Sequence, residues 1–290
     1  MNTSGFGKTQ MRPPIVDGIF YPSSKIKLKK QVEQFINSVE RPEDNALAVI
    51  TPHAAFQYTG RLIAEAFKAA ALREIKTVVI IGPMHRDPID RFALPTARFF
   101  LTPMGKIRVN NKYIDALSKA DKSFVFNNIP HFEEHSIEIQ LPFIQFLFPK
   151  ADIVPILTGK TTENNIKRLS RSLHLTFGTD YKYILFVATL NTSSYIYGTD
   201  PEAEASQFER LLITRNWHEI INAAEHKGLS ACNLTGISSI LAFADSINEG
   251  KYKIEILDTA TTGITTRSMQ KRVFYTSAAL CLEEKNEEVR

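Results

Sequence analysis

Two histidines follow apolar runs at equivalent positions and could bind a metal ion together. His53 comes shortly after residues 46–50, and His85 comes shortly after residues 77–81. Both runs favour β structure and end in turns that contain proline or glycine. Neutral imidazole is a common ligand of zinc, copper and iron. If the two strands are neighbours in a parallel sheet, both imidazoles lie at one edge. A lone loop histidine is more often an ordinary surface residue, so the hypothesis rests on the pair.

Cys232 is the third candidate ligand. It directly precedes a helix-like run, residues 234–248. A thiolate near a helix N-terminus is stabilised by the helix dipole, which lowers its pKa. The alternative is a buried, unreactive thiol. Cys281 has no comparable surroundings and is assigned no role. Two cysteines in 290 residues do not make a disulfide framework and fit a reducing compartment.

His135 is a candidate catalytic acid or base. In a helix it would share a face with Glu138, as would Glu134. A histidine held by a carboxylate keeps one tautomer and can exchange protons near neutral pH. The alternative is a polar helix start whose charges lie in water. The remaining histidines lack such neighbours and are predicted to have surface or capping roles: His131, His174, His218 and His226.

The apolar patterns predict a single α/β domain over residues 1–290, in which residues 1–11 are flexible. Near-continuous β-favouring runs predict strands covered on both faces. Helical spacing alternates with them, which predicts a central, mainly parallel or mixed sheet flanked by helices. Functional groups of such sheets gather at the carboxyl ends of the strands. Pro142 predicts a kink in its helix. The predicted strands are 46–50, 77–81, 151–157, 183–188, 253–257 and 273–278, and the helices are 62–70, 137–148, 208–224 and 237–248.

Composition narrows the classes of function. A chain of this length can bury a large core without a metal, so a metal site would be functional rather than structural. The net charge of +4 is small, and the basic run 25–30 predicts a solvated helix start, so no nucleic-acid partner is expected. No signal peptide or membrane span is recognisable, which predicts a cytoplasmic protein. Motifs of nucleotide-binding loops, serine hydrolases and zinc peptidases are also missing from the sequence.

Four sequence segments resemble motifs of the Memo family and occur in the same order as in that family. Residues 12–22 resemble its opening motif, 52–60 and 81–85 its two histidine motifs, and 134–143 its most specific motif. The resemblance covers about residues 12–280. This family is similar in fold to the class III non-haem iron extradiol dioxygenases, the LigB type. The resemblance implies that His53, His85 and Cys232 form a metal pocket for Fe(II), Cu or Zn, with His135 beside it for substrate contact.

The sequence departs from the family pattern around that pocket. The family's aspartate and histidine after the late core strand align with Asn191 and Ser194, neither of which is charged or carries protons near neutral pH. Residues 232–236 and Ala55 also differ. The three ligands are therefore retained while their surroundings are altered. Loss of such supporting groups typically weakens metal affinity or activity by about 10- to 100-fold.

Three functional hypotheses follow from the resemblance. The first is a metal-dependent redox or oxygen-handling enzyme of the dioxygenase-like type. The second is a non-catalytic binding or adaptor module for a small molecule, protein or peptide. Bacterial and archaeal relatives often occur with a radical-SAM protein, in the AmmeMemoRadiSam system, which makes such a protein a candidate partner. The third is a degenerate paralogue that stabilises an oligomer with active relatives. The altered residues Asn191 and Ser194 favour the second hypothesis.

Overall fold

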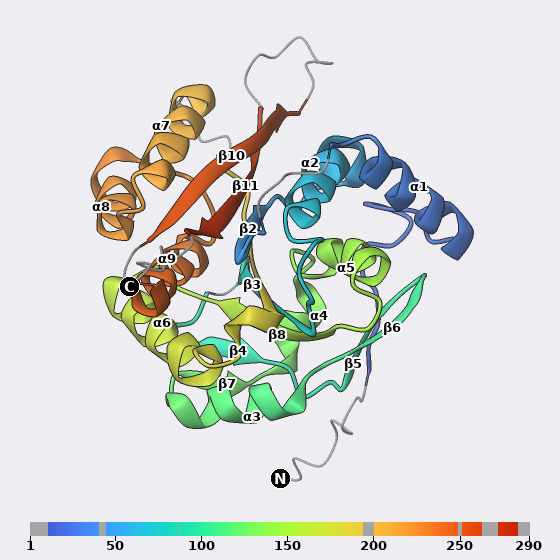
Figure 1. Ribbon diagram of the computed structural model, residues 1–290, viewed down its shortest axis with the longest axis horizontal. Helices are drawn as coiled ribbons and strands as arrows, with labels where there is room; N and C mark the ends of the chain where they lie inside the picture. Colours follow the sequence, from blue (N-terminus) through green and yellow to red (C-terminus); the bar gives the residue numbers. More distant parts are fainter. Residues whose placement is uncertain are drawn as a thin grey trace, which may run out of the picture.

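The computed structural model describes residues 11–40, 45–86, 88–193, 200–248, 251–262 and 272–283. These residues form a mixed eight-stranded sheet between two groups of helices (Figure 1), which confirms the predicted α/β class. The strand order is β10-β11-β2-β9-β3-β8-β4-β7. The strands are β2 (Ala48–Thr51), β3 (Thr77–Pro83), β4 (Phe92–Leu94), β7 (Phe124–Phe126), β8 (Asp152–Thr158), β9 (Ile184–Thr189), β10 (Tyr252–Thr261) and β11 (Phe274–Leu282).

The four central strands are parallel and wholly buried. Strands β2, β9, β3 and β8 pair in that order, and every residue in them is buried. This burial explains their near-continuous apolar sequences, because helices cover both faces of the sheet. Strands β2 and β3 are not direct neighbours, because β9 lies between them. All three still end at the same edge because all run in one direction.

Two helix groups cover the sheet on opposite sides (Figure 1). On one side α1, α2 and α5 contact one another, and α2 lies against β2, β10 and β11. On the other side α9 packs on α6 and contacts β3 and β9, while α3 and α8 complete the layer. The helices are α1 (Lys25–Asn37), α2 (Phe56–Lys68), α3 (Asn111–Ala120), α4 (Asn128–Glu133), α5 (Leu141–Leu147), α6 (Glu163–Phe177), α7 (Pro201–Ile213), α8 (Trp217–Lys227) and α9 (Leu234–Asn248).

Two predicted helices differ from the structure. The segment 137–148 is a short 3₁₀ turn, η1 (Glu138–Gln140), followed by α5. Pro142 lies in the first turn of α5, where its missing N–H costs no helical hydrogen bond, so the predicted kink does not occur. The segment 208–224 is two helices, α7 and α8. They separate at Arg215, whose φ of 63° ends the helical path.

A buried ion pair holds the start of the described chain against the middle of the domain. The Arg12 guanidinium pairs with the Glu138 carboxylate, and their side chains are 1% and 0% exposed. Glu138 also accepts hydrogen bonds from the Tyr21 hydroxyl at 2.5 Å and from the backbone N–H of Ile15 and Val16. These contacts fix the segment that follows β1 (Met11–Arg12), which joins β5 (Phe99–Thr102) and β6 (Gly105–Arg108) in a small second sheet.

The Arg12 guanidinium also binds the segment that leads to the edge of the sheet where the candidate site lies. Arg12 donates from Nε to the carbonyl of His131 at 2.8 Å and from Nη2 to the carbonyl of Glu134 at 2.7 Å. Glu138 therefore faces Arg12 and Tyr21 rather than His135, which corrects the predicted pairing of His135 with Glu138. Neither Glu138 nor Glu134 is solvated, because both are buried.

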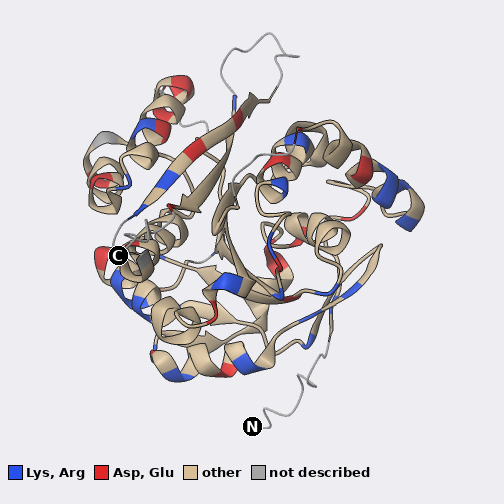
Figure 2. Ribbon diagram, viewed as in Figure 1, with Lys and Arg blue, Asp and Glu red and all other residues tan. Residues whose placement is uncertain are grey.

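Charged side chains on the exterior are mixed in sign. Figure 2 shows lysine and arginine residues spread over several helices and strands rather than gathered on one element. The basic run at residues 25–30 begins α1, as predicted. Among the described helices, none has the length and apolar character needed to cross a bilayer. The absence of a nucleic-acid partner and the cytoplasmic location stay predictions.

We expect Glu138→Gln to destabilise the protein by about 3–5 kcal/mol, because it leaves the Arg12 charge buried without a partner. Chemical denaturation measures this free energy of unfolding. The matched control is Glu163→Gln, which breaks the solvent-exposed ion pair with Lys167 and should leave stability unchanged. Equal effects of the two substitutions would contradict the assigned importance of the buried pair.

His131 gives the folded protein a built-in acid sensitivity. The sequence predicted a surface or capping role, but His131 is buried, and its Nε2 lies 3.1 Å from the Ala93 carbonyl. Burial lowers the pKa of His131 to about 3; the bond to Ala93 opposes this shift and Arg12 adds to it. The folded state therefore disfavours protonation that the unfolded chain accepts at its ordinary pKa near 6.5.

Because the pKa of His131 is lower in the folded state, its contribution to the free energy of unfolding is complete above about pH 6.5. This contribution falls as the pH drops toward 3, at about 1.4 kcal/mol per pH unit. We expect His131→Phe, which keeps a ring beside Phe100, to lose stability less steeply with acid than the wild type. Unfolding free energies between pH 8 and 4 test this. The exposed control His226→Asn should follow the wild-type slope, and parallel curves for His131→Phe would disprove the assignment.

Candidate metal centre

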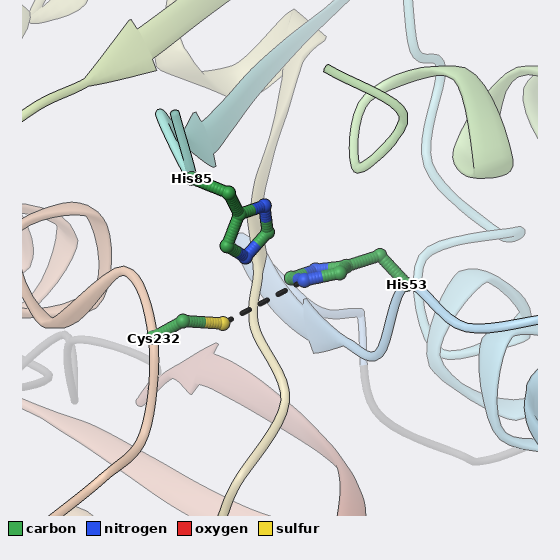
Figure 3. Close-up of side chains that lie close together, drawn as sticks. All are labelled: His53, His85 and Cys232. Carbon is green, nitrogen blue, oxygen red and sulfur yellow. Dashed lines mark hydrogen bonds between the residues drawn. The ribbon is translucent and has the colours of Figure 1, made fainter. Parts of the chain in front are cut away.

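Three parallel strands deliver the residues of the candidate site to one edge of the sheet. His53 follows β2 by two residues, His85 follows β3 by two, and Asn191 follows β9 by two. Cys232 does not follow a strand but lies two residues before the start of α9. The candidate ligand atoms of His53, His85 and Cys232 all lie within 4.8 Å of one another. Figure 3 shows these three side chains pointing toward a common point.

His53 is held from outside by the end of β9. Its Nδ1 forms a hydrogen bond with Thr189 Oγ1 at 2.8 Å, and its Nε2 lies 3.6 Å from Cys232 Sγ. Burial is the main cause that lowers the pKa of His53 well below its usual value, with the charges of His85 and His135 adding to it. The ring is therefore neutral at pH 7, the state in which imidazole binds a metal.

His85 is oriented by Glu134. Its Nδ1 lies 2.8 Å from Glu134 Oε2, and this carboxylate also accepts from the backbone N–H of His135 and Ser136, each at 2.9 Å. Hydrogen bonding to Cys232 and then to Glu134 raises the pKa of His85 to about 10, although burial opposes the shift. Burial alone would raise the pKa of Glu134, but the bond to His85 and the nearby positive charges lower it to about 2.

The backbone of Asn191 supports Cys232, and its side chain supports His53. Its N–H points at Cys232 Sγ at 3.2 Å, and its carbonyl accepts from the Cys232 N–H at 3.3 Å. Its Oδ1 accepts from the backbone N–H of His53 at 3.1 Å. A neutral amide oxygen can accept this bond as a carboxylate would. Ser194, the second altered position, lies outside the described residues.

His135 lies beside the three candidate ligands. Its ring centroid is 5.7 Å from that of His53 and 5.8 Å from that of His85. Burial is the largest cause that lowers the pKa of His135, so the ring is neutral at pH 7. Its carboxylate neighbour is Glu134, with His135 Nδ1 3.5 Å from Glu134 Oε1, and not Glu138 as the spacing predicted.

The geometry contains a second set of possible ligands, made of His85, Glu134 and His135. Two histidines and a carboxylate are a common iron-binding combination. However, Glu134 already accepts four hydrogen bonds, from the ring and backbone of His85 and from the backbone of His135 and Ser136. Its lone pairs are therefore engaged. The structure favours Glu134 as the group that orients His85 and favours Cys232 as the third ligand.

The site opens into a cavity of about 290 Å³. This volume is at the small end of the range for sites that bind organic ligands. The three histidine rings form much of its wall. Its lining is completed by Met84, Arg86, Pro130, Glu133, Glu134 and Asn191. Cys281 is buried in β11 and does not line this cavity.

Asn233 is the main site residue that the sequence interpretation missed. Its Nδ2 donates to the carbonyls of Ile81 at 2.8 Å and Thr189 at 3.0 Å, and its Oδ1 accepts from Thr158 Oγ1 at 2.8 Å. It also accepts from the N–H of Gly236 in the first turn of α9. One buried side chain thus joins the ends of β3, β8 and β9 to the helix that follows Cys232.

A signal for Asn233 was present in the sequence. Asparagine before a helical run is a common N-cap, and it tolerates the positive φ of 59° found here. Gln140 was also missed as a supporting residue. Its Nε2 donates to the carbonyl of Pro52 at 2.9 Å and so fixes the backbone next to His53. Nothing in its spacing indicated this long-range contact.

Comparison with known proteins identifies the family of this chain. The family model described as Memo-like protein matches residues 12–279. This chain belongs to the Memo family. It is 27% identical to a MEMO1 family protein of Thermotoga neapolitana over 93% of this chain and 99% of the relative. It is also 27% identical to one from Caldivirga maquilingensis, over 92% and 98%. The chain is also similar to a crystal structure of an uncharacterized protein from Escherichia coli K12, with 12% identity and a TM-score of 0.46. The match covers 80% of this chain and 98% of that protein.

We expect Asn233→Ala to lower the free energy of unfolding by at least about 2 kcal/mol, because it leaves buried hydrogen-bonding groups of three β-strands without a partner. Asn233→Gly removes the strain of the positive φ but leaves the same groups without a hydrogen-bond partner, so it should be nearly as destabilising. Denaturant unfolding measures both. The exposed control Asn222→Ala in α8 should have little effect. Full stability of Asn233→Gly would show that backbone conformation, rather than the hydrogen bonds, explains this residue.

Proposed function

We propose that this Memo-family protein binds one transition-metal ion through His53, His85 and Cys232 and uses it in redox or oxygen-handling chemistry. One observation carries the proposal. Both imidazoles have their Nδ1 atoms engaged by outer partners, Thr189 and Glu134, each at 2.8 Å. Metal-binding histidines are commonly oriented in this way, so that the other nitrogen is presented to the metal.

The donor set favours copper over the other two candidate ions. Two imidazoles and a thiolate form a softer set than the two histidines and carboxylate of non-haem iron enzymes. Soft thiolate ligands select copper and zinc, and of these only copper changes its oxidation state. A bound copper ion would supply electron transfer or oxygen chemistry. The family membership is established, and the metal and the reaction are the proposal.

The protein's own residues have separate tasks in this proposal. His53, His85 and Cys232 hold the ion, and Thr189 and Glu134 orient the two rings. His135 lines the cavity with a neutral ring, so it can accept a proton from a substrate bound there. Asn191 keeps Cys232 and His53 in register through its backbone and side-chain hydrogen bonds. Met84 and Pro130 contribute apolar surface to the cavity.

Titration of metal-free protein with Cu(I), in competition with a chelator of known affinity, tests the site. We expect one equivalent to bind, and His53→Ala and Cys232→Ser each to abolish tight binding because they remove a ligand. Cys281→Ser is the matched control and should bind like the wild type. Absence of stoichiometric copper binding, and of iron and zinc binding in parallel titrations, would overturn the proposal and leave the adaptor module and the degenerate paralogue as the remaining hypotheses.

The orienting role of Glu134 gives a separate prediction. Glu134→Gln keeps the size of the side chain but weakens its bond to His85 Nδ1, so metal affinity should fall by about 10- to 100-fold while the stoichiometry stays at one. The same competition titration measures this ratio. If Glu134→Gln instead abolishes binding completely, Glu134 is itself a ligand, and the set of His85, Glu134 and His135 replaces the one proposed.

A further inference from the structure

The wall of the cavity next to His85 carries a cationic side chain that forms no ion pair with the described residues. Arg86 directly follows His85 and lines the cavity together with all three site histidines. Within the described ranges, the ion pairs involve other cations, and none includes Arg86. The four hydrogen bonds that Glu134 accepts come from His85, His135 and Ser136. The guanidinium is therefore available to a ligand.

The loop that carries Arg86 is anchored on both sides. Before it, the N–H of Met84 donates to the carbonyl of Thr158 at 2.8 Å. After it, the N–H of Lys160 donates to the carbonyl of Ile89 at 3.1 Å, and Asn165 Nδ2 donates to Asp90 at 2.5 Å. These contacts hold the loop against the end of β8. Arg86 is thus positioned at the cavity by the fold rather than placed on a free surface loop.

Gly159 makes this anchoring possible. A Cβ at this position would lie 1.7 Å from the carbonyl oxygen of Ile89, a distance at which two atoms cannot coexist. Only glycine lets the loop approach β8 so closely. The position of Arg86 and the identity of residue 159 are therefore linked, which provides a way to move the arginine without mutating it.

We propose that the ligand of the cavity is a small molecule with a carboxylate or phosphoryl group, which Arg86 binds beside the metal centre. The inference rests on the proposed function for the placing of this ligand next to a metal. A planar guanidinium can form two parallel hydrogen bonds to either group. The imidazole rings, Met84 and Pro130 provide an apolar and aromatic surface for the rest of the molecule. Glu133 lines the same cavity and disfavours a second negative charge on the ligand.

Binding of matched aromatic probes tests the proposal in the metal-free and copper-loaded protein, by ligand-detected NMR and calorimetry. Benzoate and phenyl phosphate carry the anionic groups, and benzamide is the neutral counterpart of benzoate. We expect one of the two anions to bind at least about 10-fold more tightly than benzamide. Arg86→Gln should remove this difference, and Arg86→Lys should restore part of it. Which anion binds more tightly distinguishes the carboxylate from the phosphoryl class.

Two further variants separate position from charge. Gly159→Ala keeps Arg86 but displaces its loop, so it should weaken anion binding by about as much as Arg86→Gln. Glu133→Gln should leave anion binding unchanged or strengthen it. Binding of both anions no tighter than that of benzamide, anion binding that survives Arg86→Gln, or no binding of either anion at millimolar concentration would each overturn the proposal.

Failure of this inference can be told apart from failure of the proposed function. Arg86 is not a ligand, so Arg86→Gln should bind copper with wild-type stoichiometry. Anion binding that depends on Arg86 in a protein that binds no metal would support the anion site and refute the metal centre. Normal metal binding without an anion preference would support the metal centre and refute the anion site.

Discussion

The buried pair of Arg12 and Glu138 is the interaction on which the placement of the site depends. Two charges without solvent are stable only when every other polar contact is satisfied. Here Tyr21, two backbone N–H groups and three carbonyls complete the shell around the pair. Because Arg12 binds the carbonyls of His131 and Glu134, the pair also positions the segment that supplies the side chains of Glu134 and His135 to the cavity.

Strand β9 joins the separate parts of the site. Thr189 at its end orients His53, and Asn191 just beyond it braces both His53 and Cys232. Asn233 then ties the end of β9 to β3, β8 and α9. The candidate ligand atoms thus lie close together because supporting contacts join β3, β8, β9 and α9 around them. Rigid outer contacts of this kind reduce the cost of ordering the ligands when a metal binds.

Three histidines in one cavity are held in different protonation states by their surroundings. His53 is fully buried and lies beside the charged His85, so its pKa is lowered and it stays neutral. His85 faces a thiol and a carboxylate, and its raised pKa makes it the charged member of the group in the metal-free protein. His135 is neutral but borders the open cavity. The three rings are in this way distinguished by their neighbours rather than by residue type.

The sequence by itself determined the α/β class, the family, the strands β2, β3, β8, β9, β10 and β11 and the helices α2 and α9, because local apolar patterns and spaced motifs encode these directly. It also indicated His53, His85, Cys232 and His135 as a group. Only the tertiary structure decided that β9 separates β2 from β3, that Glu134 rather than Glu138 serves the histidines, and that His131 is buried. It also showed Asn233 and the anchored loop of Arg86. These features depend on contacts between residues far apart in the chain, for which spacing along the sequence carries no signal.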